Sequence, residues 1–135
     1  MKKKGAYHLM LSVSNRKKSK LFYNSLFKLL NWKTVYEDSE SAGYSDGKFT
    51  LWIVPSENKK QKKHNFKSVG FHHFAIRVET KKDVDKAHNW CKKQKIMIID
   101  SPSKYPEYSK NYYATFFLDP DGMKIEIVYT WIRDV

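Results

Sequence analysis

The sequence contains no apolar run approaching the roughly 18 residues that cross a bilayer. Its start, MKKKGAYHLMLSVS, places His8 and two serines where a secretion signal would have its apolar segment, so we expect a soluble, unprocessed chain. Cysteine is also nearly absent. The single Cys91 excludes an internal disulfide and a multi-cysteine zinc site, and it favours the reducing cytoplasm as the compartment.

Arginine is scarce among the basic residues. Lys and Arg total 26 against 14 Asp and Glu, a net charge of +12, yet the only arginines are Arg16, Arg77 and Arg133. Lysine lacks the forked geometry that reads guanine or clamps phosphate. The pattern therefore favours a lysine-coated surface over nucleic-acid binding, with attraction to anionic substrates or membranes as the alternative.

Glycine and proline are few, at five and four in 135 residues, whereas 41% of the residues are apolar and 16% are aromatic. This composition excludes a disordered or fibrous chain. The length excludes large folds such as the barrel of about 250 residues. We expect one domain over residues 1–135.

The first half predicts a strand, a helix and three further strands. Alternating apolar residues predict a strand over 8–14, and Asn15 is suited to cap the helix that follows. The apolar stripe of this helix contains Leu21, Phe22, Leu26, Leu29 and Leu30. The three further strands are predicted at 32–37, 42–45 and 48–54, with a turn at Asp46-Gly47.

The second half predicts the same order after an exposed connector over 56–70. A strand covers 73–79, and Thr80 with Asp83 begins a helix whose buried stripe contains Val84, Ala87, His88 and Cys91. The remaining segments are a short strand at 97–100, a loop over 101–111, and strands at 112–119 and 123–130 that a tight turn joins.

The two halves align with each other. Residues 8–13 align with 73–78, each segment opening with a histidine, and Asp46-Gly47 matches Asp121-Gly122. This internal repeat predicts an α+β fold of two tandem βαβββ modules, at about 6–55 and 71–130.

The repeat also predicts a metal site. A lone histidine at a strand start is more often structural, but the repeat places His8 and His73 on equivalent faces, opposite the aliphatic side chains. Glu126 lies between Ile125 and Ile127, so it faces the same side as the histidines. Two imidazoles and one carboxylate are a typical set for a divalent ion such as Zn, Ni, Mn, Fe or Co, and they leave positions open for water or substrate.

The segments HLMLSVSN, LFYNSLF, GFHHFAIRV and FFLDPDGMKIEIVY resemble the vicinal oxygen chelate superfamily. This superfamily includes glyoxalase I, fosfomycin-resistance enzymes, extradiol dioxygenases, methylmalonyl-CoA epimerase and bleomycin-binding proteins. The resemblance implies a concave mixed sheet with helices on its outer face, metal ligands at His8, His73 and Glu126, and a homodimer. By strand alternation, we expect His72 on the face opposite His73.

One position departs from the glyoxalase I pattern, in which the last strand of the first module supplies a fourth ligand. Depending on the alignment, that position is Leu51 or Trp52 here, and neither side chain can bind a metal. The resemblance then implies a site of three ligands, as in fosfomycin-modifying enzymes or facial-triad dioxygenases.

The function implied is a metal-dependent enzyme that acts on a small oxygen-chelating substrate, with lyase, isomerase, epoxide-opening and dioxygenase chemistry all open. Glu126 is the catalytic candidate, because it or a metal-bound water could move a proton. Trp52, Arg77 and Tyr112 are candidate substrate contacts, with ordinary packing as their alternative. The alternative function is a non-catalytic protein that binds a drug or another small molecule.

Overall fold

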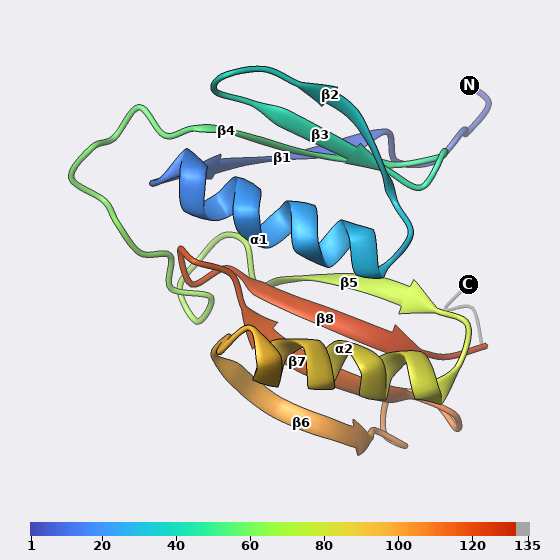
Figure 1. Cartoon of the computed structure of the whole chain (residues 1–135). Coiled ribbons are helices and arrows are strands. Elements are labelled where there is room, and N and C mark those ends of the chain that lie inside the picture. The colour runs from blue at the N-terminus through green and yellow to red at the C-terminus, as the bar shows by residue number, and fades with distance from the viewer. Residues whose placement is uncertain (132–135) are drawn as a thin grey trace. The chain divides into compact units, whose positions relative to one another are not determined.

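The chain forms two units that repeat one order of elements. A computed structural model describes residues 1–131, and these divide into Met1–Lys63 and a second unit that begins at His64. Each unit contains one helix and one four-stranded mixed sheet (Figure 1). This confirms the predicted α+β fold of tandem βαβββ modules. Neither helix is long and apolar enough to cross a membrane.

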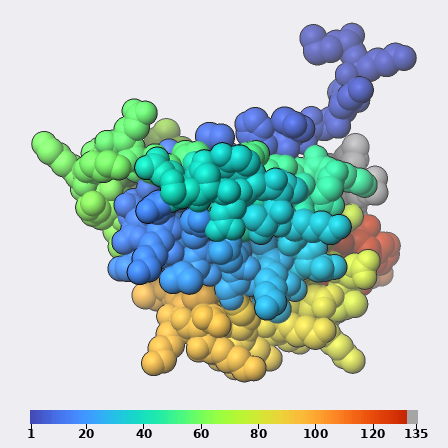
Figure 2. Space-filling model, turned by 45° about the horizontal axis from the view of Figure 1, so that its top comes forward, coloured from blue at the N-terminus to red at the C-terminus, as the bar shows by residue number. Residues whose placement is uncertain are grey.

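The first unit has the sheet order β1-β4-β3-β2, in which β1 and β4 are parallel and the other neighbours are antiparallel. Its elements are β1 (His8–Val13), α1 (Arg16–Leu29), β2 (Lys33–Glu37), β3 (Ala42–Ser45) and β4 (Thr50–Pro55). Residues 1–6 form no helix or strand, and they project from this unit as an exposed segment, dark blue in Figure 2.

Helix α1 begins where the sequence predicts, because the Asn15 side chain accepts a hydrogen bond of 3.1 Å from the backbone N–H of Lys18. Its predicted stripe was partly wrong, since the side chains of Leu21 and Leu29 are exposed. The aromatic rings of Tyr23 and Phe27 pack near Tyr44 of β3, at centroid distances of 6.4 and 4.9 Å, and they are buried. The buried face of the helix is therefore the face that carries Tyr23 and Phe27.

The second unit repeats this arrangement with the sheet order β5-β8-β7-β6, and β5 and β8 form its parallel pair. Its elements are β5 (His73–Val78), α2 (Lys81–Lys93), β6 (Ile98–Lys104), β7 (Tyr113–Leu118) and β8 (Lys124–Tyr129). The capping box of Thr80 and Asp83 is present, and Val84, Ala87 and Cys91 are buried as predicted. The fourth residue of the predicted stripe, His88, is only partly buried.

Strand β6 is longer than predicted, because residues 101–104 continue it instead of starting the loop. Ser103 pairs with Ala114 and Lys104 pairs with Tyr113, after two irregularities in the register. Pro102 lies between the paired positions Asp100 and Ser103. Proline has no N–H to give to a ladder, so an irregular register accommodates it within a strand.

Each sheet has one face covered by its own helix and one face without it, which we call the site face. In β4, Leu51 and Ile53 are fully buried, and so are Ile125 and Ile127 in β8. Because side chains alternate along a strand, the residues between these positions point to the site face. Glu126 lies between the two isoleucines and so belongs to the site face of the second unit.

Candidate metal centre

Glu126 occupies the middle of β8, a strand that is paired on both sides. Its neighbours across the sheet are Ala75 of β5 and Phe116 of β7. The side chain is only 1% exposed. Burying a carboxylate away from water is costly unless partners replace the lost hydration. The residues around Glu126 supply such partners.

Both carboxylate oxygens of Glu126 are engaged. Oε2 lies 2.9 Å from Nε2 of His73, the residue that opens β5. Oε1 accepts a hydrogen bond from the hydroxyl of Tyr112, which immediately precedes β7. The His73 side chain is 33% exposed, so the pair can be reached from solvent.

The His73 and Glu126 pair fits a divalent ion. A neutral imidazole nitrogen and a carboxylate oxygen both present lone pairs, so a separation of 2.9 Å requires a proton or a cation between them. Metal bonds to such atoms are about 2.0–2.2 Å long, and both atoms can therefore reach one ion. Within either unit, the described residues form no group of three His, Cys, Asp or Glu arranged to hold a metal.

His72 does not lie opposite His73, and that prediction was wrong. The Nδ1 atoms of the two histidines are 2.6 Å apart, and Phe66 packs edge-on against the ring of His72. His72 precedes the first paired residue of β5, so strand alternation does not govern it. Partial burial, followed by the proximity of His73 and Lys124, lowers the pKa of His72. A neutral His72 can accept the Nδ1 proton of His73, and this tautomer leaves Nε2 free to bind a metal.

The structure adds Lys124 and Phe116 to the site face, and the sequence reasoning missed both. The ammonium of Lys124 lies 4.6 Å from the centroid of the Phe116 ring, and that ring packs edge-on against His73. The sequence contains a signal for Lys124, because it precedes Glu126 by two positions in one strand and side chains two positions apart point to the same face. A cation therefore lies on the same face as the His73 and Glu126 pair.

In the first unit, the strand register shows which residue is equivalent to Glu126. Met10 pairs with Trp52 in the parallel ladder of β1 and β4, as Ala75 pairs with Glu126 in that of β5 and β8. Trp52 is therefore the equivalent residue, and Leu51 is fully buried on the helix side. The first unit presents an indole where the second presents a carboxylate.

The Trp52 ring lies against the backbone of Gly43. A Cβ added to Gly43 would lie 2.8–3.0 Å from three carbons of the indole, closer than such atoms approach. The ring of Tyr36 lies on another side, with its centroid 5.6 Å from that of Trp52. The absence of a side chain at Gly43 therefore leaves the room that the indole of Trp52 occupies on the site face.

The structure places the remaining predicted residues as follows. His8 opens β1 in the first unit, where its ring packs near Tyr7 with a centroid distance of 5.4 Å. Arg77 is exposed on β5, and its spacing from His73 puts it on the site face. Tyr112 meets Glu126 directly. The meeting of His8 with His73 and Glu126 stays a prediction.

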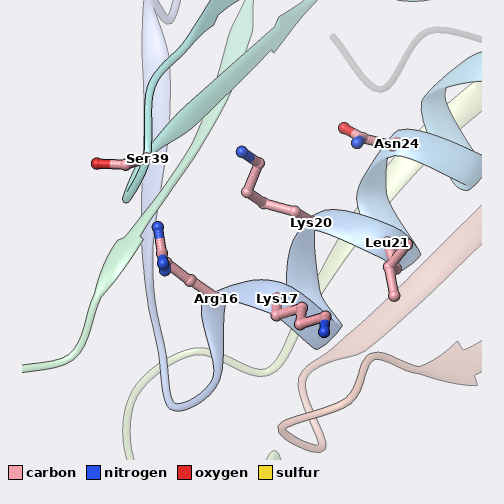
Figure 3. Close-up of a pocket in the computed structure, with 6 residues that line it drawn as sticks. All are labelled: Arg16, Lys17, Lys20, Leu21, Asn24 and Ser39. Carbon is pink, nitrogen blue, oxygen red and sulfur yellow. The ribbon is translucent and has the colours of Figure 1, made fainter.

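The first unit also has an open basic pocket on the helix side of its sheet. It has a volume of about 290 Å³ and is lined by Arg16, Lys17, Lys20, Leu21, Asn24 and Ser39. Figure 3 shows Arg16 and Lys20 reaching from α1 toward the hairpin of β2 and β3. The ammonium of Lys20 already pairs with Glu37 at 2.7 Å. This pocket is separate from the site face that carries Trp52.

Both units have the βαβββ order of elements, and the second unit pairs a histidine with a buried carboxylate on its sheet. The model of the Glyoxalase/Bleomycin resistance protein/Dioxygenase superfamily matches residues 5–127, and the chain belongs to this superfamily.

Individual relatives agree with this assignment. The chain is 28% identical to Metallothiol transferase FosB of Staphylococcus haemolyticus over 124 residues, which cover 92% of this chain and 82% of FosB. A provisionally named glyoxalase from Bacillus halodurans superposes with a TM-score of 0.79 at 25% identity, covering 93% of this chain and 95% of that one. A glyoxalase/bleomycin resistance protein from Albidiferax ferrireducens gives a TM-score of 0.73 at 20% identity, with 93% and 98% covered.

Proposed function

We propose that the protein is a divalent-metal-dependent enzyme that transfers a thiol to a small electrophile bearing an anionic group. The observation that carries this proposal is the buried Glu126 with its Oε2 atom 2.9 Å from His73 Nε2 on a reachable face. The superfamily assignment supports metal-dependent chemistry on a small molecule. The likeness to a metallothiol transferase supports a thiol as one substrate.

Three residues would hold the metal. His73 would bind through Nε2 and Glu126 through Oε2, and His8 of the first unit would complete the set. Binding by this set would join the two modules into the single domain expected over residues 1–135, with 56–70 as the connector. When bound, a divalent ion would polarise a substrate oxygen and stabilise the negative charge that develops on it.

The second unit has two positively charged side chains that would attract an anionic substrate. Lys124 lies on the site face beside Phe116, and Arg77 of β5 is exposed on that face. Opposite charges raise the local concentration of an anion and orient it. We infer that these two cations bind the anionic group while the metal ligands position the reacting oxygen.

Trp52 favours thiol transfer over isomerisation. Glyoxalase-type isomerisation needs a carboxylate opposite Glu126 to shuttle a substrate proton. The equivalent position holds an indole, which cannot accept a proton, so it would serve as an apolar wall for the substrate. In the opening of an epoxide, the thiolate sulfur bonds to carbon, the carbon–oxygen bond breaks, and the oxygen then takes a proton. We propose that Glu126 would hold or move that proton.

A parallel assay tests this proposal. The metal-loaded protein is offered a phosphonate-bearing epoxide with a thiol, a methylglyoxal hemithioacetal, and a catechol with oxygen. We expect metal-dependent epoxide opening that His73→Ala abolishes, with weak or absent isomerisation. Robust hemithioacetal turnover, lost in His8→Ala but unaffected in Trp52→Phe, would contradict the argument from Trp52. Tight binding without turnover would instead favour the alternative of a non-catalytic binding protein.

A further inference from the structure

The hydroxyl of Tyr112 is placed to control how Glu126 presents its oxygens. It donates to Oε1, while Oε2 faces His73 Nε2. A free carboxylate can rotate and can bind a metal through one or both oxygens. A donor fixed on one oxygen removes that freedom and leaves the other as the ligand.

The backbone around Tyr112 is tied down by hydrogen bonds. Its carbonyl accepts from the N–H of Tyr105 at 2.9 Å, and its N–H donates to the carbonyl of Ser109 at 3.2 Å. The hydroxyls of Ser109 and Thr130 lie 3.1 Å apart, which links the loop to the residue after β8. These hydrogen bonds hold the two ends of the loop over 105–112 together and so restrain the backbone of Tyr112.

Aromatic packing fixes the Tyr112 ring as well. Its centroid lies 5.2 Å from that of Tyr108 and 6.2 Å from that of Tyr105, both at steep angles. Tyr105 packs in turn against Phe116, which is paired with Glu126 across the sheet. The hydroxyl therefore reaches Glu126 from a ring that its surroundings already hold.

We propose that Tyr112 is a positioning residue, which fixes Glu126 through Oε1 so that Oε2 alone, beside His73, is the metal ligand. This inference rests on the proposed function in that it takes Glu126 to bind a metal. It also gives Tyr112 a role other than the substrate contact expected from the sequence.

Tyr113 provides a matched control. Its hydroxyl donates to Asp85 Oδ1 of α2 at 2.7 Å, so the two neighbouring tyrosines make equivalent bonds on opposite faces of the sheet. Tyr112→Phe and Tyr113→Phe each remove one hydroxyl and one bond to a carboxylate. We expect both changes to lower stability, but only the first removes a bond to a proposed metal ligand.

The test compares the wild type and both variants by competition with a coloured chelator and by the visible spectrum of bound Co²⁺. We expect Tyr112→Phe to weaken metal affinity about 10- to 100-fold and to alter the Co²⁺ spectrum. Tyr113→Phe should match the wild type in both measurements. Wild-type affinity and spectrum in Tyr112→Phe would overturn this inference alone. Absence of metal binding by the wild type would overturn it together with the proposed function.

A second measurement applies if Tyr112→Phe does not fold. Metal binding should then change the near-ultraviolet tyrosine absorption of the wild type and of Tyr113→Phe, because the acceptor of the Tyr112 hydroxyl becomes a metal ligand. An unchanged tyrosine spectrum on saturation with metal would overturn the inference.

Discussion

Replacing Gly43 with alanine tests the placement of the Trp52 ring on the site face. The backbone of Gly43 lies outside the left-handed region, so alanine fits its conformation. In a strand, this change alone would stabilise the fold by about 0.4–1 kcal/mol, because it restricts the unfolded chain. The ring of Trp52 reverses that expectation.

The added Cβ would lie 2.8 Å from the nearest indole carbon. Since carbon atoms in contact prefer about 3.5–4.0 Å, the ring must move by roughly 0.5–1 Å. Overpacking of this kind costs about 1–3 kcal/mol. We therefore expect Gly43→Ala to lower the free energy of unfolding by about 1–2 kcal/mol, or the melting temperature by about 3–6 °C.

Urea and thermal unfolding measure the effect, and a double-mutant cycle isolates its cause. In a Trp52→Leu background the clash is gone, so adding Gly43→Ala should stabilise the protein. Tryptophan fluorescence should shift in Gly43→Ala while metal affinity stays unchanged, because the proposed metal ligands are other residues. If Gly43→Ala stabilises the otherwise wild-type protein, the reasoning about the indole is refuted.

Two further predictions concern Cys91 and assembly. Burial raises the pKa of the Cys91 thiol to about 12, so the folded protein should not react with a disulfide reagent at about pH 8, although the unfolded protein should. In the labelling experiment, rapid reaction of the native protein would contradict the burial of this thiol. Because the unfolded thiol loses its proton near its ordinary pKa, the contribution of Cys91 to stability should also fall as pH rises from about 9 towards 12. We also predict the homodimer that the family resemblance implies, so light scattering at micromolar concentration should give twice the mass of one chain, and a monomer mass would count against it.

The fold was largely predictable because its signals are local. Asn15 and Thr80 mark the helix starts by their capping chemistry, and both caps are formed. The equivalent positions of His8 and His73 indicated the repeat. The repeat in turn predicted the order of elements that both units show. The stripe of α1 was less predictable, because aromatic contacts to Tyr44 from another strand set the rotation of that helix.

The residue types of the candidate site could be proposed from the sequence, but its hydrogen bonds could not. Alternation in β8 identified Glu126, and the structure adds its contact with His73. The choice between Leu51 and Trp52 needed the strand register, which depends on pairing between distant segments. The bond from Tyr112 to Glu126 depends on a loop whose path no local pattern specifies.

We propose that His8, His73 and Glu126 together hold one divalent ion. Metal content and affinity, measured on protein purified without a histidine tag, test it most directly. His88→Ala is the control, because His88 lies on α2 and its loss also removes one imidazole. We predict about one ion per chain for the wild type and the control, and sharply weaker binding in His8→Ala, His73→Ala and Glu126→Ala. Wild-type occupancy and affinity in His73→Ala would contradict the account.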